Sequence, residues 1–196
     1  YNQAGDTVWV DTQAGSLPDG NDYGTYISVT QFGDIVVASA TENIGSDYDF
    51  TIYHYNGLTG LLNWSYTWNG IGNGIDIPTS IDSDASGNVY VAGGTESVIG
   101  TSDFAVVKLS PSGSFLWDSY YDYSGLHDAA TNIMVKGNII VSGGSNESLG
   151  DWDIATLKLD PTTGGILTSS RSDIPDATIA EATAMVIDDY NNIYSR

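Results

Sequence analysis

Short apolar runs separated by clusters of turn-forming residues follow one another along the chain, and one such pattern occurs three times. Its copies are residues 33–55, 87–109 and 137–159. The glycine that opens each copy and the aspartate sixteen residues after it are both separated by 54 and 50 residues from one copy to the next. Two positions that keep the same spacings define a tandem repeat of about fifty residues, a period typical of propellers and solenoids.

Within the second copy, the periodicity predicts four short strands separated by turns. They are expected at residues 77–82, 89–92, 103–109 and 115–117. The second strand is apolar without alternation, which is expected when both faces of a strand are covered. In the third strand, Lys108 lies on the face opposite to its apolar neighbours. Four short antiparallel strands per repeat correspond to one propeller blade, whereas solenoid coils are usually shorter, so we predict an all-β propeller of four-stranded blades.

The other copies follow the same scheme. An acidic residue stands five positions before an aliphatic residue of each first strand (Ile27, Ile81, Ile133 and Val186), at Asp22, Asp76, Asp128 and Glu181. One position of the fourth strand carries a large apolar side chain in every copy, at Trp9, Trp64, Trp117 and Leu167. This recurrence favours packing between blades. Residues 179–187 are helical by propensity alone, yet their place in the repeat predicts a strand.

On this scheme residues 1–15 hold the last strand of a preceding blade, and blades follow at residues 22–70, 76–124 and 128–175. Residues 179–196 form the first half of a further blade. An open stack of blades leaves unpaired sheet edges, which natural folds avoid. We therefore expect either the remainder of a larger ring of six to eight blades or another copy of the chain to complete the stack.

The composition limits the classes of function. Twenty-five acidic and five basic residues give the 196-residue chain a net charge of −20. Such a surface repels phosphate backbones, so we expect no nucleic-acid partner. No apolar run approaches the roughly 18 residues of a membrane helix, so we expect no membrane insertion. There is no cysteine, which excludes disulfides and thiolate metal sites.

The stretch from Asp76 to Trp117 has a pattern that resembles a known family. It contains an aspartate five residues before Ile81, then the run 87–91 (GNVYV), an acidic loop and a third strand ending in Lys-Leu. This pattern is similar to the SBBP-type β-propeller repeats of secreted and cell-surface bacterial proteins, common in the Bacteroidetes. The first copy departs from the family pattern at His54, where lysine is usual. The resemblance implies a β-propeller fold and an extracellular or cell-surface location rather than a particular chemistry.

The loop between the second and third strands carries carboxylates in every copy. The candidate metal ligands are Glu42, Asp47, Asp49, Glu96, Asp103, Glu147, Asp151 and Asp153. Hard cations such as Ca²⁺ take six to eight oxygen ligands, and backbone carbonyls of glycine-rich loops can complete such a shell. The alternative is that the aspartates accept backbone N–H bonds and close each loop. No cofactor is required under this second interpretation, and Ca²⁺ is the only one expected under the first.

Aromatic residues outside the recurring fourth-strand position are candidates for contact with a protein or glycan ligand. They are Trp68, Tyr120, Tyr121, Tyr123 and Trp152. Amphipathic rings of this kind provide stacking surface together with a polar group.

Catalysis has little support in the sequence. His54 and His127 are the only histidines, and neither belongs to a recognisable nucleophile pattern. We expect His54 to be a solvated strand residue and assign no catalytic residue. The predicted function is therefore a non-catalytic extracellular propeller that serves as a binding or structural scaffold. The alternatives are a subunit of a self-assembling surface filament joined through open blade edges, or part of a secreted carbohydrate-active enzyme.

Overall fold

The structure is a computed structural model of the whole chain. It describes residues 4–13, 15, 17, 20–44, 47–98, 100–148, 151–172, 182–188 and 192–195, with the backbone alone at Thr25 and Val98. Throughout this part of the chain the regular elements are strands, and no helix occurs.

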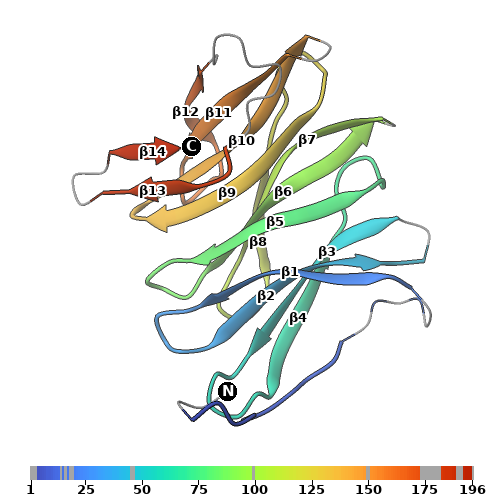
Figure 1. Cartoon of the computed structure of the whole chain (residues 1–196), viewed down its shortest axis with the longest axis vertical. Helices are drawn as coiled ribbons and strands as arrows, with labels where there is room; N and C mark the ends of the chain where they lie inside the picture. The colour runs from blue at the N-terminus through green and yellow to red at the C-terminus, as the bar shows by residue number, and fades with distance from the viewer. Residues whose placement is uncertain are drawn as a thin grey trace.

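The strands form three antiparallel four-stranded sheets, each with its strands in sequence order (Figure 1). Blade 1 consists of β1 (Asp22–Val29), β2 (Ile35–Glu42), β3 (Tyr48–Tyr55) and β4 (Leu62–Trp68). Blade 2 consists of β5 (Asp76–Ser83), β6 (Val89–Val98), β7 (Thr101–Leu109) and β8 (Phe115–Tyr121). Blade 3 consists of β9 (Asp128–Lys136), β10 (Asn138–Ser148), β11 (Asp151–Leu159) and β12 (Ile166–Ser172). The chain is thus an all-β propeller of four-stranded blades.

The two ends of the repeat array differ from the blades between them. Residues 4–13 form no strand, although a last strand of a preceding blade was expected there. Two short strands, β13 (Met185–Ile187) and β14 (Ile193–Ser195), pair as an antiparallel hairpin after blade 3. The strand expected at residues 179–187 is observed only as β13, and residues 179–181 lie outside the described residues.

The blades pack face to face, and the core lies between them. One apolar cluster joins Phe50 and Ile52 of blade 1 to Ile81 and Val107 of blade 2. A second cluster joins the opposite face of blade 2 to blade 3 in the same way. The second and third strands of blade 2 are therefore covered on both sides, which explains why β6 is apolar without alternation.

A β-bulge recurs in the first strand of every blade, and in blades 2 and 3 its residue bonds to the next first strand or to the segment that precedes it. The pairing register skips one residue in each of β1, β5 and β9. In blades 2 and 3 the skipped residue is Thr79 or Thr131. The Thr79 hydroxyl donates a 2.7 Å hydrogen bond to the carbonyl of Ala130, and that of Thr131 bonds the carbonyl of Ala182. Bulges re-aim side chains in this manner. The first strands lie one beside another across the middle of the molecule (Figure 1).

Of the recurring tryptophans, Trp64 and Trp117 lie between blades, as the repeat pattern predicts, and Trp9 packs on blade 1. Each ring packs against a glycine in the turn between the third and fourth strands of the following blade. These pairs are Trp9 with Gly60, Trp64 with Gly113, and Trp117 with Gly164. The Trp64 and Trp117 indole N–H groups also donate to the carbonyls of Pro111 and Pro161, at 3.0 and 3.3 Å. The glycines have positive φ, so a side chain would be strained there as well as crowded.

Two residues of the third strands are more buried than the sequence indicates. His54, expected to be solvated, is buried and stacks on the Trp64 ring with 5.0 Å between the ring centroids. The prediction was wrong because the neighbouring fourth strand places Trp64 directly beside the imidazole. Lys108 lies on the predicted face, yet this face is also covered. Its ammonium reaches the carbonyl of Pro161 at 2.6 Å across the blade boundary.

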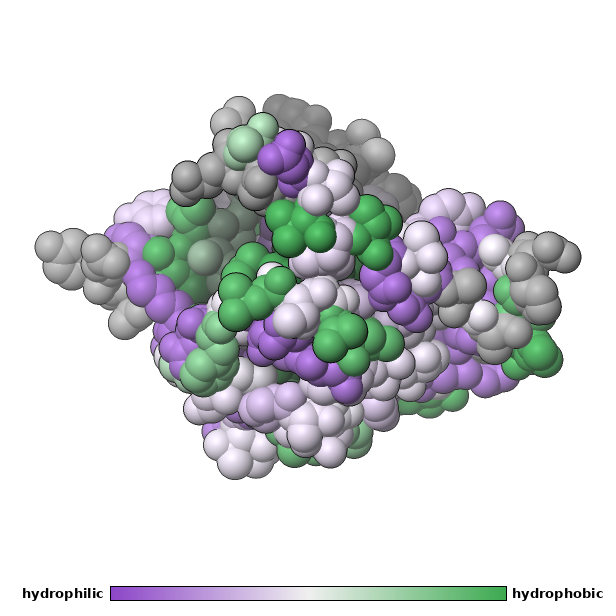
Figure 2. All heavy atoms as spheres, turned by 90° about the horizontal axis from the view of Figure 1, so that it is seen from below, coloured by the Kyte–Doolittle hydropathy of each residue, from purple (hydrophilic) through white to green (hydrophobic). Residues whose placement is uncertain are grey.

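One blade face lacks the cover that its counterparts have. Ile27 of β1 is 69% exposed, whereas the equivalent Ile81 and Ile133 are 7% and 4% exposed. Seen from the blade 1 end of the molecule, apolar side chains lie exposed among polar ones (Figure 2). Val29, which pairs with Ile35 on the same face, is 61% exposed. This face of blade 1 thus has the composition of a blade interface without a described blade packed on it.

Candidate functional site

A groove of about 400 Å³ lies at the junction of blades 2 and 3. Its floor is formed by Ile75 and Ile77, which precede and begin β5, and by Ala129 of β9. Glu96 of β6 and His127, just before β9, supply charged and polar groups to its lining. The groove therefore combines an aliphatic floor with polar groups, which is typical of ligand-binding sites.

The polar groups of the groove are fixed by backbone amides. Glu96 accepts hydrogen bonds from the N–H groups of Gly100 at 2.7 Å and Ile75 at 3.1 Å. These bonds are the first cause of the lowered pKa of the Glu96 carboxyl, so the group is a carboxylate at neutral pH. His127 Nδ1 accepts from the Ser102 N–H at 3.3 Å, and the Ser102 hydroxyl lies 3.3 Å from the same atom.

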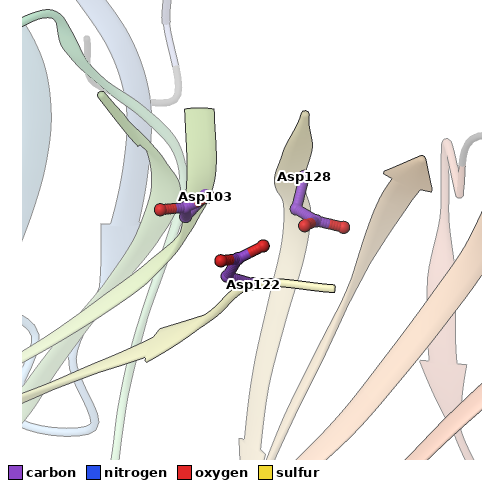
Figure 3. Close-up of side chains that lie close together, drawn as sticks. All are labelled: Asp103, Asp122 and Asp128. Carbon is purple, nitrogen blue, oxygen red and sulfur yellow. The ribbon is translucent and has the colours of Figure 1, made fainter. Parts of the chain in front are cut away.

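Three carboxylates meet beside this groove (Figure 3). Asp103 belongs to β7, Asp122 to the linker after β8, and Asp128 is the first residue of β9. One oxygen of each lies within 4.8 Å of the others. Asp103 and Asp128 are buried, whereas Asp122 is exposed. This acidic trio (Asp103, Asp122, Asp128) therefore opens to solvent on the side of Asp122.

Each carboxylate of the acidic trio uses one oxygen to hold the backbone or a neighbouring hydroxyl. Asp128 Oδ2 accepts from the Tyr123 N–H at 2.8 Å, and Asp122 Oδ1 from the Gly125 N–H at 2.8 Å. Asp103 Oδ2 accepts from the Ser97 hydroxyl. The other oxygen of Asp128, Oδ1, is buried and has no hydrogen-bond partner.

The clustering changes the acidity of the two buried members. Burial raises the pKa of the Asp128 carboxyl, and the charges of Asp122 and Asp103 raise it further, against hydrogen bonds that lower it. Burial also raises the pKa of Asp103, to which the Asp122 charge adds. Like charges in close proximity disfavour simultaneous ionisation unless a cation or a proton offsets them.

The junction of blades 1 and 2 lacks the third carboxylate of the trio. At the junction of blades 1 and 2 the equivalent positions are Asp49, Asn69 and Asp76. Trp68 and Tyr121 pair with equivalent residues of the third strands, so Asn69, which follows Trp68, corresponds to Asp122. Asp76 accepts from the Gly70 N–H at 2.6 Å, as Asp128 does from Tyr123. The first-strand aspartate therefore holds the blade linker at both junctions, and Asp122 in place of an asparagine supplies the third charge.

The sequence-based metal candidates do not gather within their loops. Among the described residues, only Asp103 of the eight belongs to a group of three potential ligands. Asp153 instead forms a 2.5 Å ion pair with Arg171, which also lies 3.8 Å from Glu147. Asp49 accepts from Asn43 at 3.1 Å, and Glu42 accepts from the Asn21 N–H at 2.8 Å. Asp47 and Asp151 are exposed. Seven of the eight acids thus lie within strands rather than in the expected loops, and Glu42, Asp49 and Asp153 contact neighbouring segments.

The aromatic candidates separate into buried and accessible residues. Trp68 is 4% exposed and packs on Phe50, so its prediction as an exposed contact residue was wrong. Its indole N–H donates to Asp118 across the blade boundary at 3.1 Å, and Tyr120 donates to the same carboxylate at 2.9 Å. Tyr121 is half-buried and packs on Phe104. Trp152 is half-buried.

Tyr123 is the most accessible of these aromatic candidates. It is 38% exposed and lies beneath the Arg171 guanidinium, whose central carbon is 3.6 Å from the ring centroid. Neither Tyr123 nor any other tyrosine or tryptophan is among the described residues that line the groove.

Sequence reasoning missed Asp122 and the role of Asp128 in a cluster. Each belongs to a different part of the repeat from Asp103, so a search within one loop does not find them. A usable signal was available, because Asp122 stands where the preceding repeat has Asn69.

Comparison with known proteins adds little to these features. No family model matches the chain, and no curated protein matches it. Among solved structures, BamB from Moraxella catarrhalis is similar at 13% sequence identity with a TM-score of 0.45. The similarity covers 93% of this chain and 57% of that one, so the chain spans little more than half of that protein's length. The assignment of the propeller architecture rests on the four-stranded blades of the chain itself.

Proposed function

We propose that the protein is a non-catalytic β-propeller scaffold that binds a protein segment in the groove between blades 2 and 3. The observation that carries this proposal is the aliphatic floor of Ile75, Ile77 and Ala129 beside the Glu96 carboxylate. An apolar side chain of a partner would fill the floor, and a basic one would pair with Glu96. The net charge of −20 favours the same kind of partner by long-range attraction.

A protein segment fits the groove better than a glycan does. Glycans are commonly held by exposed aromatic rings, and the described lining contains aliphatic residues, small residues and one histidine. An extended peptide with alternating apolar and basic side chains matches a groove whose floor is apolar and whose edge is acidic.

Binding without catalysis is favoured by the way the polar groups are engaged. Ser102 and His127 are close enough to suggest a nucleophile and its base. In such an arrangement an acid must orient the imidazole from its other nitrogen. Glu96 is held instead by the amides of Gly100 and Ile75. No described carboxylate is hydrogen-bonded to the His127 ring, so the pair supports a binding role.

An extracellular or cell-surface setting in a bacterium is part of the proposal, and so is membership of the SBBP-type repeats. Both the setting and the family membership are supported by the GNVYV pattern at residues 87–91, and the acidic composition also supports the setting. The described part of the chain contains no helix that is long and apolar enough to cross a membrane.

The binding proposal is tested by selection from a random peptide library displayed on phage. We expect peptides that combine basic and apolar residues to be enriched on the wild-type protein and to lose binding to Ile77→Asp. Leu116→Asp is the matched control, because Leu116 is an exposed residue of β8 outside the groove. Binding that survives Ile77→Asp, or that is lost equally in both variants, would contradict the proposal.

Assembly between copies of the chain is a second candidate function, and the exposed face of blade 1 favours it. A groove of about 320 Å³ on this face is lined by Ile27, Ile35, Val37 and Tyr53, among others. The equivalent residues of blade 2 pack against a neighbouring blade. The contact would join blade faces rather than the open sheet edges that the sequence led us to expect. If this candidate is correct, light scattering after gel filtration should show multimers that Ile27→Asp converts to monomers.

A further inference from the structure

We propose that the acidic trio of Asp103, Asp122 and Asp128 is a Ca²⁺ site that joins blades 2 and 3. The three carboxylates come from β7, the β8–β9 linker and β9, so one ion would connect three segments (Figure 3). This site is independent of peptide binding in the groove, and it differs from the loop sites expected from the sequence.

The spacing of the oxygens suits a Ca²⁺ ion. Ca²⁺ binds oxygen ligands at about 2.3–2.6 Å, so two ligands on opposite sides of one ion lie about 5 Å apart. The oxygens of the trio lie within 4.8 Å of one another, which allows a single ion to contact all three. Asp122 is exposed, so water can complete the coordination shell. Mg²⁺ is less suited, because it requires a stricter octahedral arrangement.

Buried polar atoms without hydrogen-bond partners provide an independent indication of a missing ligand. Asp128 Oδ1 is buried and has no hydrogen-bond partner. Ser145 is fully buried, and its hydroxyl is also unpartnered. Ser145 pairs with Asp128 across the β9–β10 ladder, and its hydroxyl lies near enough to lower the pKa of that carboxyl. An ion bound at Asp128 Oδ1 would satisfy the carboxylate and could accept the hydroxyl oxygen as a further ligand.

The equivalent pair in blade 2 shows what a closed contact looks like. There the Thr95 hydroxyl donates to Asp76 Oδ1 at 2.5 Å, so both groups are satisfied without an ion. This junction also has Asn69 where the other has Asp122, and therefore one negative charge fewer. The unpartnered Oδ1 of Asp128 and the additional carboxylate of Asp122 thus occur together at the junction of blades 2 and 3.

Arg171, which lies over Tyr123 next to Asp122 in the linker, pairs with a carboxylate outside the trio. Arg171 forms a 2.5 Å ion pair with Asp153 and stacks on Tyr123. Among the described residues it makes no ion pair with the trio. Arg171 thus does not offset the charge of the trio, and His127, whose charge acts on Asp103, is the other basic group near it.

The proposal is tested by titrating the metal-free protein with CaCl2 in an isothermal calorimeter at 150 mM KCl. We expect one saturable site per chain, with a Kd no weaker than the order of 10⁻³ M known for extracellular Ca²⁺ modules. Asp122→Asn should weaken binding at least tenfold. This variant keeps the acceptor for the Gly125 N–H and reproduces the Asn69 of the preceding junction, so it is expected to fold.

Asp47→Asn is the matched control, since it removes the same charge from an exposed loop of blade 1 and should leave the affinity unchanged. Terbium luminescence excited through the nearby Tyr121 and Tyr123 provides a second readout. Absence of saturable binding up to about ten times the upper Kd expected for such modules would overturn the proposal. Equal weakening by Asp122→Asn and Asp47→Asn, or no weakening by Asp122→Asn, would overturn it as well.

Discussion

Replacing Gly113 by alanine tests the blade-to-blade packing directly. Gly113 has φ of +80°, and a Cβ atom there would lie 2.7 Å from Cδ2 of the Trp64 ring. Gly137 has φ of +69°, and a Cβ atom would meet nothing within 4 Å. The two substitutions therefore share the backbone strain of a left-handed residue and differ in the steric clash.

The magnitudes follow from these two contributions. Left-handed strain costs a non-glycine residue about 1–2 kcal/mol. Overpacking against a ring that is held between blades adds about 1–3 kcal/mol. We expect Gly137→Ala to lower the free energy of unfolding by about 1–2 kcal/mol, and Gly113→Ala by about 2–5 kcal/mol.

Urea unfolding followed by circular dichroism measures both free energies. The additional loss in Gly113→Ala should disappear when Trp64 is also replaced by alanine, giving a coupling energy of at least about 1 kcal/mol in the double-mutant cycle. Equal effects of the two glycine substitutions, or a coupling energy near zero, would refute the packing of Trp64 on the next blade.

Two further predictions concern Asp84 and Trp68. Burial alone would raise the pKa of Asp84, but hydrogen bonds from Asn88, Tyr90 and Ser86 outweigh it and place the pKa below the ordinary 3.8. The stabilisation by Asp84 is therefore present above this ordinary pKa and is lost as the pH falls through the lower folded pKa. The difference in urea midpoint between the wild type and Asp84→Asn should accordingly shrink below about pH 4, and a difference that grows with acid would contradict this. Trp68→Ala should lower the free energy of unfolding by about 3–5 kcal/mol, because it empties a buried position, and a loss as small as that of an exposed residue would contradict the burial of Trp68.

The repeat allowed the blades to be predicted because copies of one pattern must form equivalent sheets. The spacings of 54 and 50 residues predicted where the strands of each blade lie, and β5 to β8 include the expected strands. However, β6 and β7 extend through most of the residues between 92 and 103, where a loop was expected. Trp64 and Trp117 were recognised as packing residues for the same reason. The expected ring of six to eight blades remains a prediction.

The burial of individual side chains was harder to predict, because it depends on the neighbouring blade. Lys108 and His54 have polar side chains, yet both are buried on the blade face that packs against the following blade. The long stem of Lys108 lets its ammonium reach the carbonyl of Pro161, which an alternation pattern does not reveal. The packing role of Trp68 could have been predicted, because Tyr121 occupies the same position of the next repeat and is also aromatic.

The candidate site could not be assembled from the sequence, because its residues come from different parts of the repeat. Asp103 was proposed as a ligand within its own loop, whereas its observed neighbours are Asp122 and Asp128. These residues are brought together by the linker between blades. That linker is held in place by the hydrogen bond from the Tyr123 N–H to Asp128.

The central claim is that the junction of blades 2 and 3 is the binding region of the propeller. An assigned ¹H–¹⁵N correlation spectrum of the isotope-labelled protein, titrated first with CaCl2 and then with a selected peptide, tests it most directly. The account predicts that Ca²⁺ shifts the amide signals of residues 101–103, 122–129 and 144–146. It also predicts that the peptide shifts those of residues 75–79 and 94–102. Shifts spread evenly over the blades, or confined to blade 1, would contradict the claim.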